Sequence, residues 1–285
     1  MKENEVAENV FAGTYDSSEG MEEVAEKLSL IESEDVLGDD GGANQIGMAP
    51  NATWIACRAC VGGSCTLADI NECADWILAP NGNYLNAPDI VYDNLTFSTS
   101  EDASFLPKVT AWRAAGIMPV TGLGNYGPTC GSIRAPGSYQ ETFAAAGHNN
   151  TRTIATWSGR GPSPFGHYPF TKPNISAPGV SIRTSTIGSG YASMNGASFS
   201  GAHAAGAVAL LWSMNPNFIG QLEVTFSLLQ SSADPAPAGN CGAPPDSEGN
   251  YTYGYGFLDV YAAGQKLVSS WRIADPTPFD YTRLG

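Results

Sequence analysis

The stretch NGASFSGAHAAG (residues 195–206) places Ser198 after a glycine-containing turn and at the start of a long apolar run. The run continues through Met214, which predicts a buried helix with Ser198 in its first turn. Free N–H groups and the positive end of the helix dipole gather there and stabilise an oxyanion formed beside a nucleophile. A serine that only caps the helix is the commoner use of such a position, so both interpretations stand on this stretch alone.

A second candidate is Asn125 in GLGNYGP (residues 122–128), which directly follows an apolar segment predicted to be a buried strand. An asparagine at a strand end can donate a side-chain hydrogen bond to a developing oxyanion. A turn asparagine without chemistry is the alternative.

Apolar segments alternate with helical patterns along the chain. We expect strands at 52–60, 87–97 and 117–125, short strands at 142–147 and 153–158, and helices at 17–34, 67–78 and 105–116. The helix at 67–78 turns Ile70, Cys73 and Ile77 inward, and Gly116 closes the helix at 105–116. This order predicts an α/β fold with a mostly parallel sheet, helices on both faces and ligands at the carboxyl ends of the strands.

Acidic residues dominate the charge. The formal net charge is −15, which argues against a nucleic-acid partner. Residues 1–40 hold 13 of the 28 acidic residues, so this segment differs in composition from the rest. Its predicted helix carries an apolar stripe through Met21, Val24, Leu28 and Ile31, which favours packing against a core. No apolar run of about 18 residues occurs, so no membrane span is expected.

Cysteines and glycosylation sequons favour a secreted chain. The six cysteines are Cys57, Cys60, Cys65, Cys73, Cys130 and Cys241. We favour disulfides over free thiols, and free thiols over a metal site, because two C-x-x-C pairs and a neighbouring histidine are lacking. The order of the elements suggests Cys57–Cys73 and Cys60–Cys65, leaving Cys130 and Cys241 paired or free. Asn-x-Ser/Thr triplets occur at Asn51, Asn94, Asn149, Asn174 and Asn250. The opening MKENEVAENV, however, has no apolar region of a signal peptide.

Several segments together resemble the subtilisin family of serine proteases. Residues 195–206 are similar to its nucleophile motif N-G-T-S-M-A-x-P-H-V-A-G, and residues 114–128 to its oxyanion segment. The segments at 42–60, 156–185 and 253–263 resemble its G-V-A-P-x-A, S-S-R-G-P…K-P-x-I-x-A-P-G and G-Y-G-x-(I/V)-(D/N)-A…A patterns. The similarity runs in order over residues 38–267.

This resemblance implies a subtilisin-like three-layer fold, with Ser198 as the nucleophile and Asn125 as the oxyanion-hole donor. It also implies an extracellular, monomeric protein with a polypeptide substrate or ligand. Calcium is a cofactor only by resemblance, because no loop has a recognisable ligand pattern. Residues 1–37 do not match the family, 38–267 form the peptidase domain without its N-terminal part, and 268–285 are a C-terminal tail.

The resemblance fails at the catalytic Asp and His, whose D-T/S-G and H-G-T-H motifs are absent. The chain has three histidines. His148 and His167 fall in polar loop segments after Asn125. His203 matches the motif's own structural histidine, and five helical residues turn it about 140° away from Ser198. A register without gaps puts the base position at Leu28, and Asp16 is better interpreted as a turn residue.

The substrate-binding segment also departs from the family pattern. DIVYDNLTF (residues 89–97) stands where the family has D-V-x-x-x-S-(W/L)-G, so the glycine of the substrate-pairing edge is lost. We therefore predict a serine endopeptidase domain with impaired catalysis through a Ser198 acyl-enzyme. The alternative is an inactive pseudoprotease or truncated gene product that acts at most as a peptide-binding module.

Overall fold

The computed structural model describes residues 36, 38, 41, 45–57, 59–61, 64–165, 170–186, 190–245 and 248–274. The predicted helix at 17–34, Leu28, Asp16 and His167 lie outside the described residues. Among the residues that are described, no helix is long and apolar enough to cross a membrane.

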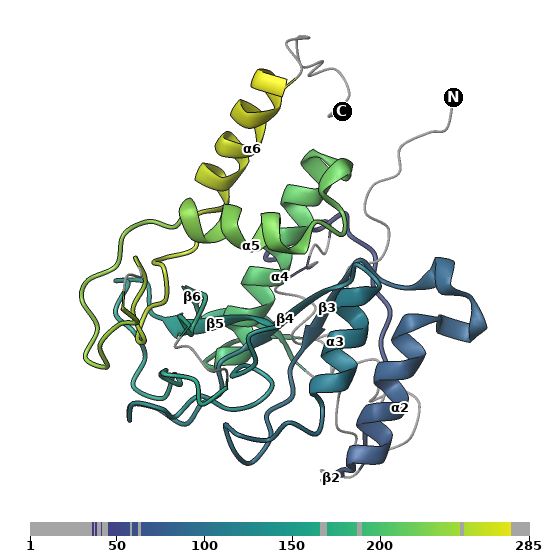
Figure 1. The fold of residues 1–285 in the computed structure, drawn as a ribbon, viewed down its shortest axis with the longest axis horizontal. Helices are drawn as coiled ribbons and strands as arrows, with labels where there is room; N and C mark the ends of the chain where they lie inside the picture. The colour runs from purple at the N-terminus through teal and green to yellow at the C-terminus, as the bar shows by residue number, and fades with distance from the viewer. Residues whose placement is uncertain are drawn as a thin grey trace.

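A four-stranded parallel sheet forms the centre of the fold (Figure 1). Its strands are β3 (Ile90–Asp93), β4 (Met118–Gly122), β5 (Phe143–His148) and β6 (Ile175–Pro178), in the order β3-β4-β5-β6. All three pairs are parallel, with Ile90 opposite Met118, Val120 opposite Phe143 and Ala145 opposite Ile175. The carboxyl ends of the four strands therefore lie along one edge of the sheet.

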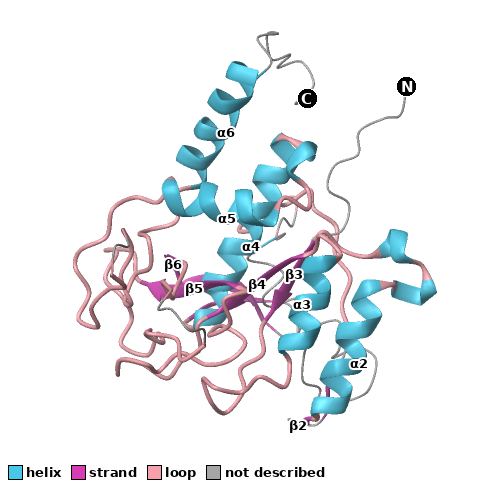
Figure 2. Ribbon diagram, viewed as in Figure 1, coloured by secondary structure: helices cyan, strands magenta, loops and turns pink. Residues whose placement is uncertain are grey.

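Helices cover both faces of this sheet (Figure 2). Successive side chains of a strand point to opposite faces. Accordingly, Ile90 and Tyr92 pack in the core under α4 (Ala197–Met214), whereas Val91 packs with α2 (Leu67–Leu78) and α3 (Leu106–Ala114). The outcome is the three-layer α/β architecture predicted from the sequence.

Two further helices extend the layer of α4. The helix α5 (Leu222–Ser231) is fixed by a hydrogen bond from Trp212 Nε1 to Thr225 Oγ1 and by the edge-to-face pair of Phe143 and Phe226. The helix α6 (Val260–Ala274) packs with its first turns against α4 and α5 and then projects from the body (Figure 1). On α6, Ala263 and Leu267 lie four residues apart and are buried in the same core cluster as the residues of α4.

The remaining elements are short. The strands β1 (Cys60–Val61) and β2 (Ser64–Cys65) form one hairpin, and β7 (Ile182–Thr186) and β8 (Gly190–Met194) form another. Three 3₁₀ turns, η1 (Pro80–Gly82), η2 (Tyr84–Asn86) and η3 (Pro216–Phe218), complete the described elements.

Three strands were predicted to be longer than they are in the structure. Residues 52–57 have no regular structure, and the strand begins only at Cys60. The strand predicted at 87–97 covers only Ile90–Asp93, and 153–158 contributes one bridge, at Ile154. Apolar composition alone does not make a strand, because the backbone also needs a neighbouring strand with which to pair.

Helix predictions matched more closely. The helix α2 has the predicted bounds and buries Ile70, Cys73 and Ile77 as expected. Gly116 ends the turn after α3 with a φ of 81°, a left-handed conformation that glycine adopts without strain.

Disulfides join Cys57 to Cys73 and Cys130 to Cys241. The first confirms the predicted pairing, and the second decides between the two alternatives left for Cys130 and Cys241. The backbone register places Cys60 opposite Cys65, and their disulfide stays a prediction.

Candidate active site

Ser198 is the second residue of α4, at the carboxyl edge of the sheet. The main-chain carbonyl of Ser198 accepts a hydrogen bond of 2.6 Å from the Tyr92 hydroxyl on β3. The first turns of α4 also approach β4 closely, since a Cβ built on Gly122 would lie 2.5 Å from the Ala197 carbonyl oxygen. Ser198 is thus held by the sheet, and its N–H has no intrahelical partner at this position.

Asn125 lies three residues beyond β4 and reaches the same helix end. Its side-chain Oδ1 accepts a hydrogen bond of 2.8 Å from the Ala197 N–H. Because the oxygen faces the helix, the Nδ2 donors face away from that bond. Among the described residues, neither the Ser198 N–H nor Asn125 Nδ2 is used by these bonds, so both are candidate donors to an oxyanion.

The bond from Ala197 also makes Asn125 a cap for α4, whose own N-cap residue, Gly196, makes no side-chain cap. We expect Asn125→Ala to lower the free energy of unfolding by about 1 kcal/mol, as for the loss of an N-cap acceptor. Asn125→Asp keeps the acceptor, so its stability should stay near that of the parent. Urea unfolding of both variants measures this difference. Equal losses in the two variants would contradict the capping role.

A small depression of about 70 Å³ opens beside Ser198. It is lined by Asn94, Leu95, Thr96, Thr121, Gly122, Gly124, Asn125, Ala197 and Ser198. The segment 94–96, which the resemblance assigns to substrate pairing, thus lies next to the candidate nucleophile, with Thr96 at the position of the lost glycine. None of the described residues that line the depression is titratable.

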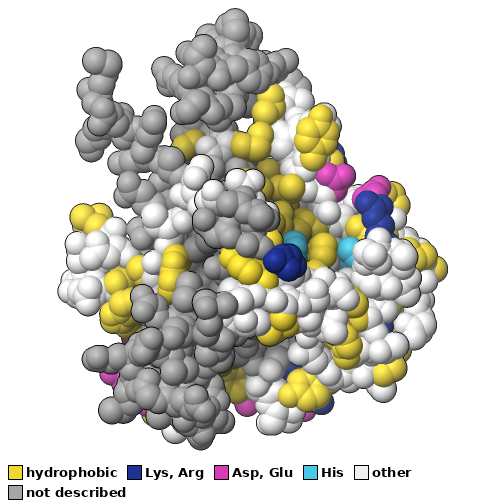
Figure 3. Space-filling model, turned by 180° about the vertical axis from the view of Figure 1, so that it is seen from behind, with side chains coloured by type: hydrophobic (Ala, Val, Ile, Leu, Met, Phe, Trp, Pro, Cys, Tyr) yellow, Lys and Arg dark blue, Asp and Glu magenta, His cyan; other side chains and the backbone are white. Residues whose placement is uncertain are grey.

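The described histidines lie elsewhere. His148 belongs to the buried strand β5, where its Nδ1 donates to the Asn149 carbonyl. The prediction that it lies in a polar loop was wrong, since the apolar run that precedes it extends into the strand. His203 lies on α4, with its Nδ1 bonded to the Phe199 carbonyl. Figure 3 shows histidine side chains on the face opposite to that of Figure 1.

Burial lowers the pKa of both His148 and His203, and each histidine further lies in the field of another cationic group. In both rings burial is the largest cause of the lowered pKa, and the hydrogen bond to a backbone carbonyl opposes it. Ser198 Oγ makes no hydrogen bond to either ring, nor to any other described side chain. A histidine base for Ser198 is thus lacking among the described residues.

Asp93, which the sequence analysis did not single out, ends β3 directly before Asn94. It is 5 % exposed, and one carboxyl oxygen accepts a 2.9 Å hydrogen bond from the Leu95 N–H. The other oxygen has no partner among the described residues, and the group borders an apolar cavity of about 10 Å³ between α2, α3 and β3. Burial raises the pKa of Asp93 to about 7, although the bond from Leu95 opposes this shift.

Asp93 should make stability fall with rising pH. The folded chain keeps its proton up to about pH 7, whereas the unfolded chain loses it near the ordinary value of 3.8. Stability is thus lost between about pH 4 and pH 7, by roughly 4 kcal/mol for this one group. We expect Asp93→Asn to flatten the pH profile and to be more stable than the parent at pH 8. Urea unfolding at pH 4, 6 and 8 tests this, and parallel profiles for parent and variant would refute it.

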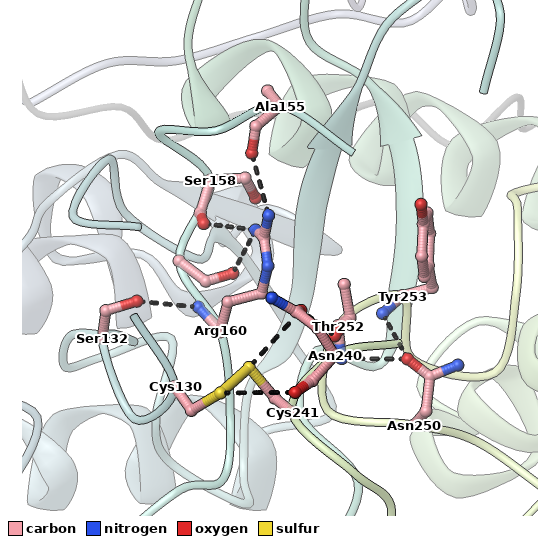
Figure 4. Close-up of a disulfide and its surroundings, with 11 residues drawn as sticks. Cys130, Ser132, Ala155, Ser158, Arg160, Asn240, Cys241, Asn250, Thr252 and Tyr253 are labelled. Atoms are coloured by element: carbon pink, nitrogen blue, oxygen red, sulfur yellow. Dashed lines mark hydrogen bonds between the residues drawn. A yellow bond between two sulfur atoms is a disulfide. The ribbon is translucent and has the colours of Figure 1, made fainter. Parts of the chain in front are cut away.

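The loop after Asn125 is hydrogen-bonded to the segment 157–160, and Figure 4 shows Arg160 of that segment. Backbone bonds join Gly127 N to Trp157 O, Gly159 N to Gly124 O and Ile133 N to Arg160 O. The buried Arg160 guanidinium donates to the carbonyl oxygens of Ala155, Ser158 and Gly159.

A disulfide adds a covalent clamp to the same loop. Cys130, five residues after Asn125, is joined to Cys241 in the loop that precedes α6, as Figure 4 shows. The loop that carries Asn125 is therefore fixed at both ends, by the sheet on one side and by this disulfide on the other.

Tyr92 was also missed by sequence reasoning. Its hydroxyl spans from β3 to α4 and fixes Ser198 across a separation of 106 residues. An acid and a tyrosine inside the short apolar run IVYD were the available signal, because buried polar groups need partners. The partner itself could not be read from the sequence.

A serine at a helix end beside an amide donor, on the carboxyl edge of a parallel sheet, is the arrangement of a serine hydrolase. A comparison with known proteins points to the same class of protein. The family model described as "Subtilase family" matches residues 33–256. The chain belongs to this family of serine proteases.

Among its relatives, Bacillopeptidase F of Bacillus subtilis (strain 168) is 37% identical over 241 residues, which cover 80% of this chain and 16% of that protein. Serine protease AprX of the same organism is 32% identical over 199 residues, covering 60% of this chain and 44% of that protein. The chain thus spans less than half the length of either relative.

Solved structures share the fold. The prenylagaramide maturation protease PagA superposes with a TM-score of 0.69 at 17% identity, over 92% of this chain and 94% of that chain. The patellamide maturation protease PatA also gives a TM-score of 0.69 at 17% identity, over 92% of this chain and 97% of that chain.

Proposed function

We propose that this domain is a serine endopeptidase domain whose catalysis is impaired. Ser198 serves as the nucleophile that forms the acyl-enzyme, and its own N–H together with Asn125 Nδ2 forms the oxyanion hole. A polypeptide is the ligand, because the family acts on peptide bonds and segment 94–96 lies beside Ser198.

One observation supports the proposal that catalysis is impaired. The described residues around Ser198 supply two oxyanion donors but no group able to take the serine proton. A hydroxyl is a weak nucleophile unless an adjacent base activates it. The oxyanion hole alone leaves only a small part of the rate enhancement of a complete triad.

The second candidate is a pseudoprotease that binds a peptide without cutting it. The depression beside Ser198 and a larger one of about 330 Å³ favour this alternative. The larger one is lined by Leu67, Ile70, Leu95, Thr96, Phe97, Ser98, Asp102 and Ser104. Its apolar side chains suit an apolar side chain of a bound peptide.

Labelling with a fluorophosphonate decides whether Ser198 is activated. We expect the purified chain to label no faster than Ser198→Ala, because the probe reacts with serines that a base deprotonates. Fast labelling of the parent that Ser198→Ala abolishes would establish a competent site and refute the impairment.

The remaining assignments belong to the same proposal. Residues 38–267 form the peptidase domain, residues 1–37 a separate acidic segment and 268–285 a tail. The protein is a secreted monomer, an assignment that the disulfides Cys57–Cys73 and Cys130–Cys241 support because such bonds persist in oxidising compartments. Among the described residues, no cluster of acidic, histidine or cysteine side chains suits a metal ion, so calcium is kept only as a family trait.

A further inference from the structure

The five sequons of the chain differ sharply in what their asparagine side chains do. An N-glycan is a bulky, hydrophilic group that must project into solvent. An asparagine can carry it in the folded protein only where its amide is exposed and is not part of the packing. Each of the five can therefore be compared on burial and hydrogen bonding.

Asn174 is excluded by its surroundings. It is 6 % exposed, and its Oδ1 accepts 2.8 Å hydrogen bonds from the Ala144 N–H and from Lys172 Nζ. Lys172 is itself fully buried, and its amine also donates to the Thr142 carbonyl at 2.5 Å. A sugar at Asn174 would have to enter this polar cluster inside the fold, and burying its hydroxyls without partners is unfavourable.

In three other sequons the asparagine side chain is half-buried and takes part in hydrogen bonds. Asn94 lines the depression beside Ser198 and accepts a bond from the Tyr92 hydroxyl. Asn149 Oδ1 accepts three bonds, from Thr151 N, Thr151 Oγ1 and Thr153 N. Asn250 Oδ1 accepts bonds from Thr252 N and Tyr253 N, while its Nδ2 faces the Pro237 carbonyl at 3.4 Å. These amides shape the turns in which they lie.

Asn51 differs from all of them. It occupies the third position of the turn Ala49-Pro50-Asn51-Ala52, which the bond from Ala52 N to Ala49 O closes. The side chains of Asn51 and Thr53 are both exposed, and Asn51 makes no side-chain hydrogen bond to a described residue. After the turn the chain runs on to Cys57 without regular structure.

The turn itself is firmly anchored. Ala49 is 5 % exposed and its N–H donates to the Val36 carbonyl. Met48 lies against α4 at Gly206, where an added Cβ would be 2.7 Å from the Met48 Cβ. Gly206 is eight residues along α4 from Ser198, about 12 Å of helix rise. A group on Asn51 therefore projects from a turn that is anchored to the fold through Ala49 and Met48.

We propose that Asn51 is the N-glycosylation acceptor of this protein. Its donor is a lipid-linked oligosaccharide pyrophosphate. Asn51 Nδ2 forms a bond to the anomeric carbon of the sugar, the bond from that carbon to the pyrophosphate oxygen breaks, and the lipid pyrophosphate leaves with the electron pair. Nδ2 loses one proton. The proposal rests on the secreted location proposed above and is independent of catalysis at Ser198.

Expression of the full chain behind a cleavable secretory leader in yeast tests the acceptor directly. The leader delivers the chain to the glycosylating compartment. A lack of glycosylation at Asn51 would therefore count against Asn51 as the acceptor and not against the proposed secretion. Secreted and cell-retained chains are treated with peptide-N-glycanase in H₂¹⁸O, which marks each formerly glycosylated asparagine as ¹⁸O-aspartate. Mass spectrometry of the peptides then maps the sites.

We expect the mark at Asn51. Asn51→Gln and Thr53→Ala should remove it, whereas Thr53→Ser, which keeps the sequon, should retain it. Urea unfolding confirms that the variants fold. An unmarked Asn51 in both the secreted and the retained chain, or a marked Asn174 in the secreted chain, would overturn the proposal.

Discussion

Without an added base, the purified chain is expected to hydrolyse a peptide p-nitroanilide no faster than its Ser198→Ala variant. In subtilisin itself, removal of the catalytic histidine alone lowers kcat by about 2 × 10⁶. The described residues around Ser198 offer no substitute, because the depression is lined by amide, hydroxyl and aliphatic groups. Turnover of order 1 s⁻¹ that Ser198→Ala abolishes would refute the proposal of impaired catalysis. A comparison of the two proteins on casein extends the test to a protein substrate.

External imidazole should restore part of the missing chemistry. If the site lacks only its base, imidazole that diffuses into the open depression can accept the Ser198 proton. We expect a rate increase that depends on imidazole concentration and is absent in Ser198→Ala, whose reaction also corrects for hydrolysis by imidazole alone. An increase that is equal in the parent and Ser198→Ala would show that Ser198 takes no part.

The same assay separates the two roles of Asn125. Loss of the corresponding donor in subtilisin lowers kcat by about 10²–10³. Asn125→Asp keeps the bond from Ala197 to Oδ1 but has no Nδ2 donor, so it should fold normally and lose the imidazole-dependent rate. Full rescue in Asn125→Asp would mean that the amide serves only as a helix cap.

The residues at the helix end were predictable because the signals are local. Ser198 follows a glycine turn and opens an apolar run, and α4 begins at Ala197. The helix α2 was predicted to the residue, since Thr66 caps it through a bond from Asp69 N and three inward side chains recur at helical spacing. Such patterns need no knowledge of distant parts of the chain.

The ends of the strands and the hydrogen-bond partners of buried side chains could not be predicted from local sequence. Residues 52–57 are as apolar as a strand, but strand structure requires a neighbour, and the described sheet begins at β3. His148 was assigned to a loop because polar residues follow it, yet it pairs with Pro178 as the last residue of β5. The contact from Tyr92 to Ser198 depends on the order of strands, which local sequence does not specify.

Loss of the Cys130–Cys241 disulfide should be the most destabilising change to the loop that carries Asn125. The bond spans 111 residues, whereas Cys57–Cys73 spans 16. The restriction of the unfolded chain by a disulfide stabilises a protein by about 4.7 kcal/mol for a loop of roughly 100 residues and by about 3 kcal/mol for one of roughly 15. We therefore expect the double variant Cys130→Ala, Cys241→Ala to lose more stability than Cys57→Ala, Cys73→Ala.

Urea unfolding of the two double variants measures this order directly, and hydrogen exchange locates the effect. With the Cys130–Cys241 bond gone, the loop at 124–133 keeps its backbone bonds to residues 157–161 but loses its covalent link to Cys241. The amides of Gly127 and Ile133 should then exchange faster, whereas those of α2 should stay protected because Cys57–Cys73 remains intact. A smaller loss than that of the Cys57–Cys73 variant, or unchanged exchange at Gly127, would show that the backbone bonds alone hold the Asn125 loop.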